Sequence, residues 1–370
     1  MGPIRRKGSQ VLKSQEEIAQ QRLANQHISS EPFENPIEVV RWLGAVQAQD
    51  YPAARWALGL RLSEADERSI ERAFDDGAIL RTHVLRPTWH FVAPEDIRWM
   101  LQLTAQRIIA GNMGYYRKAG MNDATFKRSN QVITRELQGG KQLTRTALVT
   151  ALKDADFEFD NLGYLHLLMR AELDRVICSG PRRGKQFTYA LLEERVPPGK
   201  RFDRDEALAE LTRRYFTGHG PATPQDFAWW SGLTVADAKR GIDMVQSQLE
   251  RVEIGGNAYW SGPALSANTP QTPTAVLLPI YDECIVAYRD RSAYLRRLLA
   301  SGQQLQENIV FNHTILLDGQ IVGTWNRTLA QAEVSVSLNL FASLSSAEEE
   351  AIETAVAHYG NFLGLPVTIA

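Results

Sequence analysis

Helices followed by a two-stranded ribbon form a pattern that this chain repeats, and the repeat limits the folds it can adopt. The pattern is clearest in the middle of the chain, where helical stretches over 141–155 and 161–175 precede a strand over 175–180. A turn-rich segment, 181–185, then leads into a second strand over 186–192. Proline, glycine and charged residues between two apolar strands are typical of a hairpin. Two helices followed by a hairpin is the order of a winged-helix unit.

The same order occurs once before and once after this segment. The earlier copy is expected from helices over 37–49, 53–62 and 69–79 and from strands over 79–86 and 87–92. The later copy is expected from helices over 205–220, 223–232 and 234–250 and from a hairpin over 251–260. Each unit is small and leaves apolar surface open when alone, so the repeat predicts tandem winged-helix units that stack.

The last third of the chain changes character. A Pro/Thr-rich linker over 266–274 precedes strand-like segments over 275–280, 308–325 and 332–342 and an amphipathic helix over 345–364. The predicted fold class is therefore α+β, with tandem winged-helix units followed by a β-rich, barrel-like C-terminal domain. The expected division is a disordered basic tail over 1–14, winged-helix units over 15–112, 113–200 and 201–263, and a separate C-terminal domain over 264–370.

Composition predicts a cytoplasmic protein without cofactor or metal. The longest apolar runs are too short to cross a membrane, and no apolar segment follows the basic start of the chain. Cys178 and Cys284 stand alone, without the spacing of a zinc site. The formal net charge is −2 and the pI is about 6.4, whereas many nucleic-acid binders are strongly basic. A basic face remains compatible with this total, so charge neither supports nor excludes DNA as a partner.

The sharpest local feature is the segment Gln47-Ala48-Gln49, which precedes Pro52. Residues at i and i+2 share a face in an extended segment, and Pro52 disfavours helix just before it. If the preceding helix ends near Gln47, both amides face one cavity, where they can orient a water molecule and bind a polar substrate edge. The alternative is a pair of ordinary glutamines at a helix end, and composition alone favours that alternative.

A second group of polar residues lies in the ribbon over 79–92. It combines basic and aromatic side chains that suit phosphate contact and base stacking: Arg81, His83, Arg86, Trp89 and His90. The alternative is that Trp89 and Phe91 belong to the core. Alternation would then point His90 away from the core, toward solvent or substrate.

Two further basic groups are candidates for DNA contact. Arg182, Arg183 and Lys185 occupy the turn of the central hairpin, which reaches beyond its unit. His166 and Arg170 form a polar stripe with Asp174 on the helix over 161–175, as a recognition helix would. The alternative for the hairpin is an ordinary solvated turn.

Common catalytic and nucleotide-binding motifs are absent from the sequence, including the Walker, GxGxxG, GxSxG and HExxH patterns. Asp282 and Glu283 could act as general acid or base, although a salt bridge to a nearby arginine is the simpler account. His313 has the same ambiguity. These three residues also leave open a small-molecule site in the C-terminal domain that governs DNA binding.

Four sequence blocks together resemble a known family. They begin at Trp42, Ile79, Leu278 and Phe311 and read WLGAVQAQDYPAARWALGLRL, ILRTHVLRPTWHFVAPEDIRWML, LPIYDECIVAYRDR and FNHTILLDGQIVGTWNR. The chain is similar to the winged-helix superfamily of AlkZ-type DNA glycosylases, whose members carry a Gln–apolar–Gln motif. The resemblance implies that Gln47 and Gln49 are catalytic. It further implies an enzyme that hydrolyses the N-glycosidic bond of N7-alkylated purines and unhooks interstrand crosslinks. The absence of a lysine beside the motif favours a monofunctional enzyme that leaves abasic sites.

The main alternative is a non-catalytic winged-helix protein, such as a transcription regulator. A regulator would form a dimer that matches a symmetric operator, with the stripe of His166 and Arg170 as its reading surface. A repair enzyme would act as a monomer on double-stranded DNA of any sequence and would be associated with the nucleoid.

Overall fold

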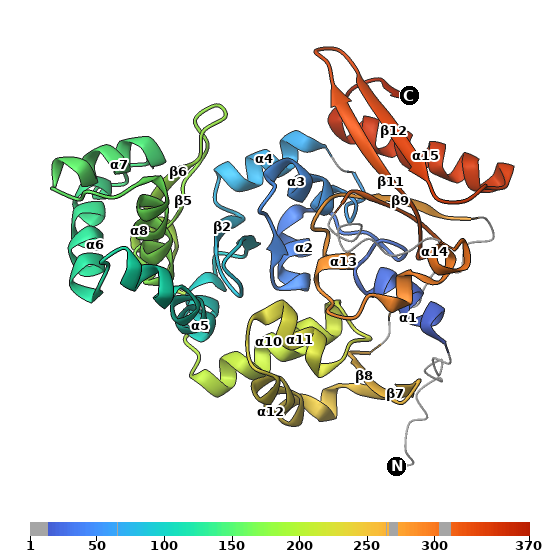
Figure 1. Cartoon of the computed structure of the whole chain (residues 1–370), viewed down its shortest axis with the longest axis horizontal. Helices are drawn as coiled ribbons and strands as arrows, with labels where there is room; N and C mark the ends of the chain where they lie inside the picture. The colour runs from blue at the N-terminus through green and yellow to red at the C-terminus, as the bar shows by residue number, and fades with distance from the viewer. Residues whose placement is uncertain (1–13, 65, 264, 266–272, 303–311) are drawn as a thin grey trace.

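The computed structural model describes residues 14–64, 66–263, 265, 273–302 and 312–370 (Figure 1). Residues 1–13 of the tail expected over 1–14 and most of the expected linker, 266–272, lie outside these residues. Helices and strands mix along the whole chain, as the α+β prediction requires. Within the described residues, no helix is both long enough and apolar enough to cross a membrane.

The first repeat surrounds the Gln47 segment. Its elements are α2 (Pro36–Leu43), β1 (Val46–Gln47), α3 (Tyr51–Gly59), α4 (Glu67–Asp75), β2 (Leu80–His83) and β3 (Trp89–Val92). The three strands form one sheet in the order β1-β3-β2. The side chain of Asn35 caps the start of α2, and Gly44, with φ of +79°, ends it. Helix α2 therefore stops well before the glutamines, because a left-handed glycine interrupts it.

The second repeat has the same order of elements. Its elements are α6 (Asp123–Leu137), β4 (Leu143–Thr144), α7 (Arg145–Asp154), α8 (Asn161–Leu173), β5 (Ile177–Ser179) and β6 (Thr188–Leu191), with the short α9 (Leu192–Arg195) behind them. The sheet order is β4-β6-β5. As in the first repeat, the last two strands form a hairpin, and the first strand pairs with the last one. A 22-residue helix, α5 (Ile97–Lys118), connects the two repeats. The boundary expected at residue 112 falls inside this helix.

The third repeat follows the same plan. Its elements are α10 (Arg204–Gly218), α11 (Pro224–Ser231), α12 (Val235–Val245), the 3-10 turn η1 (Gln246–Gln248), β7 (Glu250–Ile254) and β8 (Asn257–Ser261). An isolated bridge from Ala222 to Trp260 supplies the third strand position. Gly255 and Gly256 both have positive φ, as the predicted hairpin turn requires.

The C-terminal region forms a five-stranded sheet that curls like half a barrel. Its elements are β9 (Ala275–Leu278), α13 (Glu283–Val286), η2 (Ser292–Tyr294), α14 (Arg296–Ala300), β10 (Thr314–Leu317), β11 (Gln320–Leu329), β12 (Val334–Leu340), α15 (Ser346–Leu363) and β13 (Val367–Ile369). The strand order is β13-β12-β11-β10-β9, antiparallel except where β13 runs parallel to β12. The side chain of Ser345 caps α15, as its sequence predicts.

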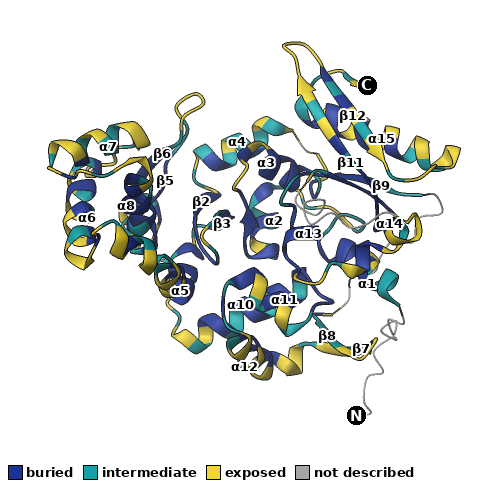
Figure 2. Cartoon of the chain, in the orientation of Figure 1, coloured by how far each residue is buried: buried dark blue, intermediate teal, exposed yellow. Residues whose placement is uncertain are grey.

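This sheet packs directly against the first repeat. Its inner face and α15 share one apolar core with residues of the first repeat, including Trp56 and Trp325. The indole Nε1 of Trp56 donates to the carbonyl of Leu277 at 2.7 Å. Figure 2 shows that the buried residues gather where the first repeat meets this region. The glutamine segment therefore lies between two parts of the chain that are distant in sequence.

The N-terminal helix α1 (Gln15–Asn25) packs against η2 of the C-terminal region and against α10 of the third repeat. Its buried Arg22 and Asn25 donate to the carbonyls of Pro221 and Gly220. Although it precedes the first repeat in the chain, α1 thus packs against the third repeat.

Candidate functional site

Gln47 lies at the edge of the first sheet, where β1 pairs only with β3. Gln47 is opposite His90 in this pairing. Gln47 is in extended strand conformation in β1, because α2 ends at Leu43, and a bend begins at Gln49. Gln47 is 6% exposed, whereas Gln49 is exposed. One glutamine is thus held inside the molecule and the other reaches its surface.

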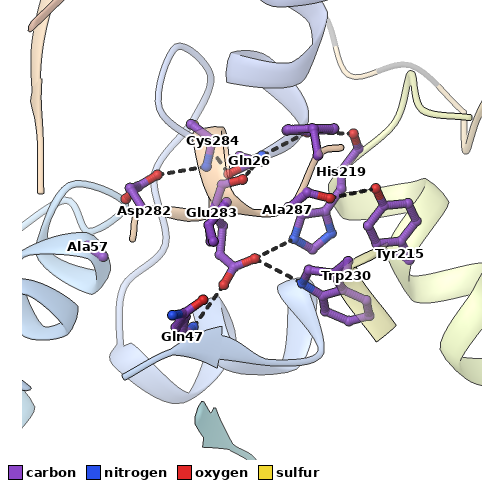
Figure 3. A network of polar contacts seen from close by, with 12 residues as sticks. Gln26, Gln47, Ala57, Tyr215, His219, Trp230, Asp282, Glu283, Cys284 and Ala287 are labelled. Carbon is purple, nitrogen blue, oxygen red and sulfur yellow. Dashed lines mark hydrogen bonds and ion pairs between the residues drawn. The ribbon is translucent and has the colours of Figure 1, made fainter. Parts of the chain in front are cut away.

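Two charged groups bind Gln47, Glu283 at its main chain (Figure 3) and Arg86 at its side chain. Its main-chain N–H donates to Oε1 of Glu283 at 2.8 Å. Its side-chain Oε1 accepts a hydrogen bond from Arg86 at 3.0 Å. A guanidinium only donates, so the amide oxygen must face Arg86 and the NH₂ group must point the other way. The orientation of the amide is therefore fixed by charge.

Glu283 forms the centre of a buried polar network. Its Oε2 accepts a hydrogen bond from the indole of Trp230 at 2.9 Å and lies 3.4 Å from Nε2 of His219 (Figure 3). Burial opposes the charge of this carboxyl, but His219, the N–H of Gln47 and the charge of Arg86 outweigh it and lower its pKa. The group is therefore an anion in a dry environment.

The main chain of Ala48, between the glutamines, is held on both sides. Its N–H donates to the carbonyl of Trp89 at 2.7 Å, and its carbonyl accepts from Nε of Arg81 at 2.9 Å. The Arg81 guanidinium stacks on Trp89, 4.3 Å from the ring centroid, and burial lowers the pKa of Arg81 to about 10. Arg81 is therefore engaged inside the protein, supporting the glutamine segment.

Gln49 is the less constrained of the two glutamines. Its Oε1 lies 3.4 Å from the main-chain N–H of Trp89, a long hydrogen bond. Directly after it, the carboxylate of Asp50 caps α3 by accepting the N–H of Ala53 at 2.9 Å. The exposed amide can thus reorient toward a substrate without breaking a strong contact.

The two histidines of the ribbon are buried. His83 pairs with Glu172, whose carboxylate also accepts the main-chain N–H of His83 at 3.0 Å. The expectation that His90 points toward solvent is wrong, because its ring is fully buried. Burial lowers the pKa of His90 to about 3, so the ring is neutral at ordinary pH. Its Nδ1 lies 2.9 Å from the carbonyl of Thr88, which identifies Nδ1 as the protonated nitrogen.

The side chains of the polar stripe on α8 are engaged in contacts within the protein. His166 is 9% exposed and stacks on Tyr115 with 4.1 Å between the ring centroids. Arg170 donates to Asp174 at 2.8 Å. In this arrangement α8 does not offer the stripe as a reading surface.

The hairpin between β5 and β6 extends away from its repeat (Figure 1), and the Arg183 side chain at its tip donates to the carbonyl of Gln142 at 2.8 Å. Arg182 is bound internally, through its main-chain N–H to Asp75 at 2.7 Å and through its side chain to Glu71 at 2.9 Å. Arg183 and Lys185 are exposed on either side of Gly184. These two side chains are the ones placed to meet a partner.

The other acidic and imidazole candidates have structural roles. Asp282 forms a fully buried ion pair with Arg61 at 2.9 Å, as the salt-bridge alternative expected. His313 accepts the main-chain N–H of Ile280 at 3.1 Å, and burial lowers its pKa to about 4. No group of three or more His, Cys, Asp or Glu side chains in the described part of the chain could hold a metal ion.

Sequence reasoning missed the tryptophan pair on α11. Neighbouring residues on a helix point in different directions, so Trp229 and Trp230 cannot share one face. Trp230 is fully buried against Glu283, whereas Trp229 is 40% exposed. The guanidinium of Arg86 lies 5.9 Å from the ring centroid of Trp229, which places an open aromatic surface near Gln47. The adjacent tryptophans were the signal that could have revealed this surface.

Comparison with known proteins identifies the family. Residues 40–362 match the family described as DNA glycosylase AlkZ-like. The chain is 27% identical over 380 residues to the interstrand DNA cross-link repair glycosylase of Streptomyces sahachiroi, covering 94% of this chain and 97% of that protein. Its fold is similar to the solved structure of the Streptomyces sahachiroi DNA glycosylase AlkZ, with a TM-score of 0.78 and 23% identity. That similarity covers 97% of this chain and all of the solved one.

The family match spans most of the chain, so the protein belongs to the AlkZ-like DNA glycosylases. It is therefore an enzyme of the hydrolase class. The family resemblance indicated by the four sequence blocks is confirmed, as is the mixed α+β fold with a curled C-terminal sheet.

Proposed function

We propose that this protein hydrolyses the N-glycosidic bond of N7-alkylated purines in double-stranded DNA, including purines joined in interstrand crosslinks, and leaves abasic sites. The observation that carries the proposal is the held amide of Gln47 beside the exposed amide of Gln49. The name of the Streptomyces sahachiroi relative, an interstrand DNA cross-link repair glycosylase, supports the crosslink as a substrate.

Hydrolysis of this N-glycosidic bond needs little acid catalysis from the protein. An N7-alkylated purine is a cation, so it leaves as a neutral base with the electron pair of the broken bond. Water forms the new bond to the sugar carbon and loses a proton to solvent. The enzyme has to place this water and stabilise a sugar with oxocarbenium character, which oriented amide dipoles can do. Gln47 and Gln49 are assigned this role.

Binding is assigned to a different set of residues. We infer that the three repeats are winged-helix units and that the exposed Arg183 and Lys185 contact phosphates. Trp229 offers an aromatic surface near the glutamines on which a base can stack. The protein is expected to act as a monomer on nucleoid DNA in the cytoplasm, which the mass of the free protein and of its DNA complex would test.

A non-catalytic regulator is the less favoured interpretation. Its proposed reading surface on α8 is occupied, since His166 stacks on Tyr115 and Arg170 pairs with Asp174. No other described helix was assigned such a role by its sequence.

The decisive experiment uses a duplex with one N7-alkylguanine, incubated with excess enzyme and then cleaved with alkali at abasic sites. Gln47→Ala and Gln49→Ala are expected to slow excision by about 100-fold, as removal of one oriented donor does in other enzymes. Binding of the same duplex should persist in both variants. Crosslinked duplexes are tested next. Intact binding without excision of either lesion by the wild-type protein would overturn the proposal in favour of the regulator.

A further inference from the structure

Glu283 is a buried carboxylate that the reaction proposed above does not yet use. It lies 236 positions from Gln47 in the chain, yet its Oε1 accepts the Gln47 N–H at 2.8 Å. Sequence reasoning regarded it as a candidate acid or base. A fully buried group whose oxygens already accept hydrogen bonds from protein donors is poorly placed to exchange protons with substrate.

The geometry points to Glu283 as the positioning residue that sets the main chain of Gln47 for catalysis. This inference rests on the proposed function, because it assigns Glu283 its effect through the Gln47 amide. It also gives the C-terminal region, which carries Glu283 on α13, a direct part in the reaction.

The edge position of β1 explains why such a residue is needed. β1 pairs with β3 on one side only, so the N–H of Gln47 on the other side has no strand to bind. A buried main-chain donor requires a partner. Glu283 takes the place of the missing strand and holds β1 at its position from that side.

The shape of the network requires a carboxylate. Oε1 accepts from Gln47, while Oε2 accepts from the indole of Trp230 and lies 3.4 Å from Nε2 of His219. A carboxylate offers acceptors on both oxygens, whereas an amide offers one oxygen and one donor group. Glutamine at this position would turn its NH₂ group toward a donor on one side and weaken one of the contacts.

Glu283 and Arg86 act on Gln47 together. The anion binds its main chain and the cation binds its side-chain oxygen, so both ends of the residue are fixed before substrate arrives. In a water-excluded setting such preorganised charges lose little energy to reorganisation during reaction. The pair thereby sets both the position and the orientation of the amide.

The test is Glu283→Gln in the full-length protein, with single-turnover excision measured on the N7-alkylguanine duplex. Displacement of a catalytic group by about 1 Å costs up to about 100-fold in rate, so we expect a loss of about 10- to 100-fold. DNA affinity is expected to change by less than about two-fold, because Glu283 is buried. Glu283→Asp keeps the charge but shortens its reach, and it should also be slow. It serves as the second variant if Glu283→Gln fails to fold.

Asp226→Asn is the matched control. Like Glu283, Asp226 is a fully buried carboxylate, but it lies on α11. It accepts the main-chain N–H groups of Arg289 and Asp290, which follow α13 in the C-terminal region. It makes no contact with Gln47 in the described structure. Asp226→Asn is expected to lower thermal stability yet to excise at the wild-type rate well below its melting temperature.

A double-mutant cycle separates positioning from general damage. In the Gln47→Ala background, Glu283→Gln should cause no further loss, since the side chain that it positions is gone. Independent losses that multiply, or Glu283→Gln at the wild-type rate, would overturn the inference while leaving the glycosylase intact. Failure of the proposed function looks different, because the wild-type protein itself would then excise nothing.

Discussion

At the scale of single residues, the candidate site consists of two neutral amides, one of which is held by buried charged groups. Gln47 is clamped by Glu283 and Arg86, and Ala48 by Arg81 and Trp89. Four of the side chains expected to touch DNA instead lie inside the protein: Arg81, His83, His90 and His166. The residue types were recognised from the sequence, but their burial depends on contacts between distant segments.

A substitution of Arg86 tests whether this residue positions the Gln47 amide or contacts a DNA phosphate. Arg86→Met removes the charge that orients the Gln47 amide while keeping an apolar stem. We expect single-turnover excision to fall by about 10-fold, because the amide can then rotate. The salt dependence of DNA affinity should stay the same. A reduced salt slope with an unchanged rate at saturating enzyme would instead assign Arg86 to a DNA phosphate.

His90 makes stability depend on pH. Its folded pKa is about 3 and its ordinary value is 6.5, so between these values the unfolded chain binds a proton that the folded protein does not. Stability therefore falls as the pH drops below about 6.5, by up to about 1.4 kcal/mol for each pH unit. Urea unfolding measures the free energy of unfolding at pH 7 and at pH 5. The difference between these two free energies should be smaller for His90→Gln than for the wild type. Equal differences would contradict the assignment.

At the scale of elements, the sequence was informative where periodicity is strong. The hairpins of the three repeats and most of their helices occur where the pattern predicts them. The first expected helix ends at Leu43 and not at residue 49, and the helices α5 and α6 and the two-residue strands β1 and β4 were not predicted. A strand of two residues has no periodicity of its own, and β1 exists because β3, which is distant in the chain, pairs with it. The glutamine segment is thus shaped by a tertiary contact.

The hairpin between β5 and β6 is expected to supply affinity and not chemistry. Arg183→Gln with Lys185→Gln removes two exposed charges and should reduce the salt slope of binding by about 0.9 for each phosphate that is no longer neutralised. The weakening should be the same on damaged and undamaged duplexes. Excision at saturating enzyme should keep the wild-type rate. Arg182→Gln is a useful comparison, since it breaks the ion pair with Glu71 and lowers stability instead.

At the scale of the whole molecule, the parts of the chain are less independent than their sequences suggest. The prediction of a separate C-terminal domain followed from a change in composition. Composition does not reveal that the inner face of the sheet packs on the first repeat, with Trp56 and Trp325 in one core. The same packing brings Glu283 to Gln47, so the site could not be completed from local patterns. Only the glutamine segment itself was predictable from local sequence.

The ion pair of Arg61 and Asp282 connects the first repeat to the C-terminal region. Substitutions in this pair test whether the two parts unfold together. Both side chains are fully buried, and Arg61 also donates to Gln26 at 2.8 Å. Asp282→Leu strands a buried cation and should lower the free energy of unfolding by about 3–5 kcal/mol. Arg61→Met with Asp282→Leu removes both charges and should recover much of that stability, because apolar replacements avoid the desolvation cost. Urea denaturation followed by tryptophan fluorescence measures both values.

If the first repeat and the C-terminal sheet unfold as one, each variant will show a single transition, shifted as a whole. Two separate transitions in Asp282→Leu would mean that the parts are independently stable and that Gln47 depends on their docking.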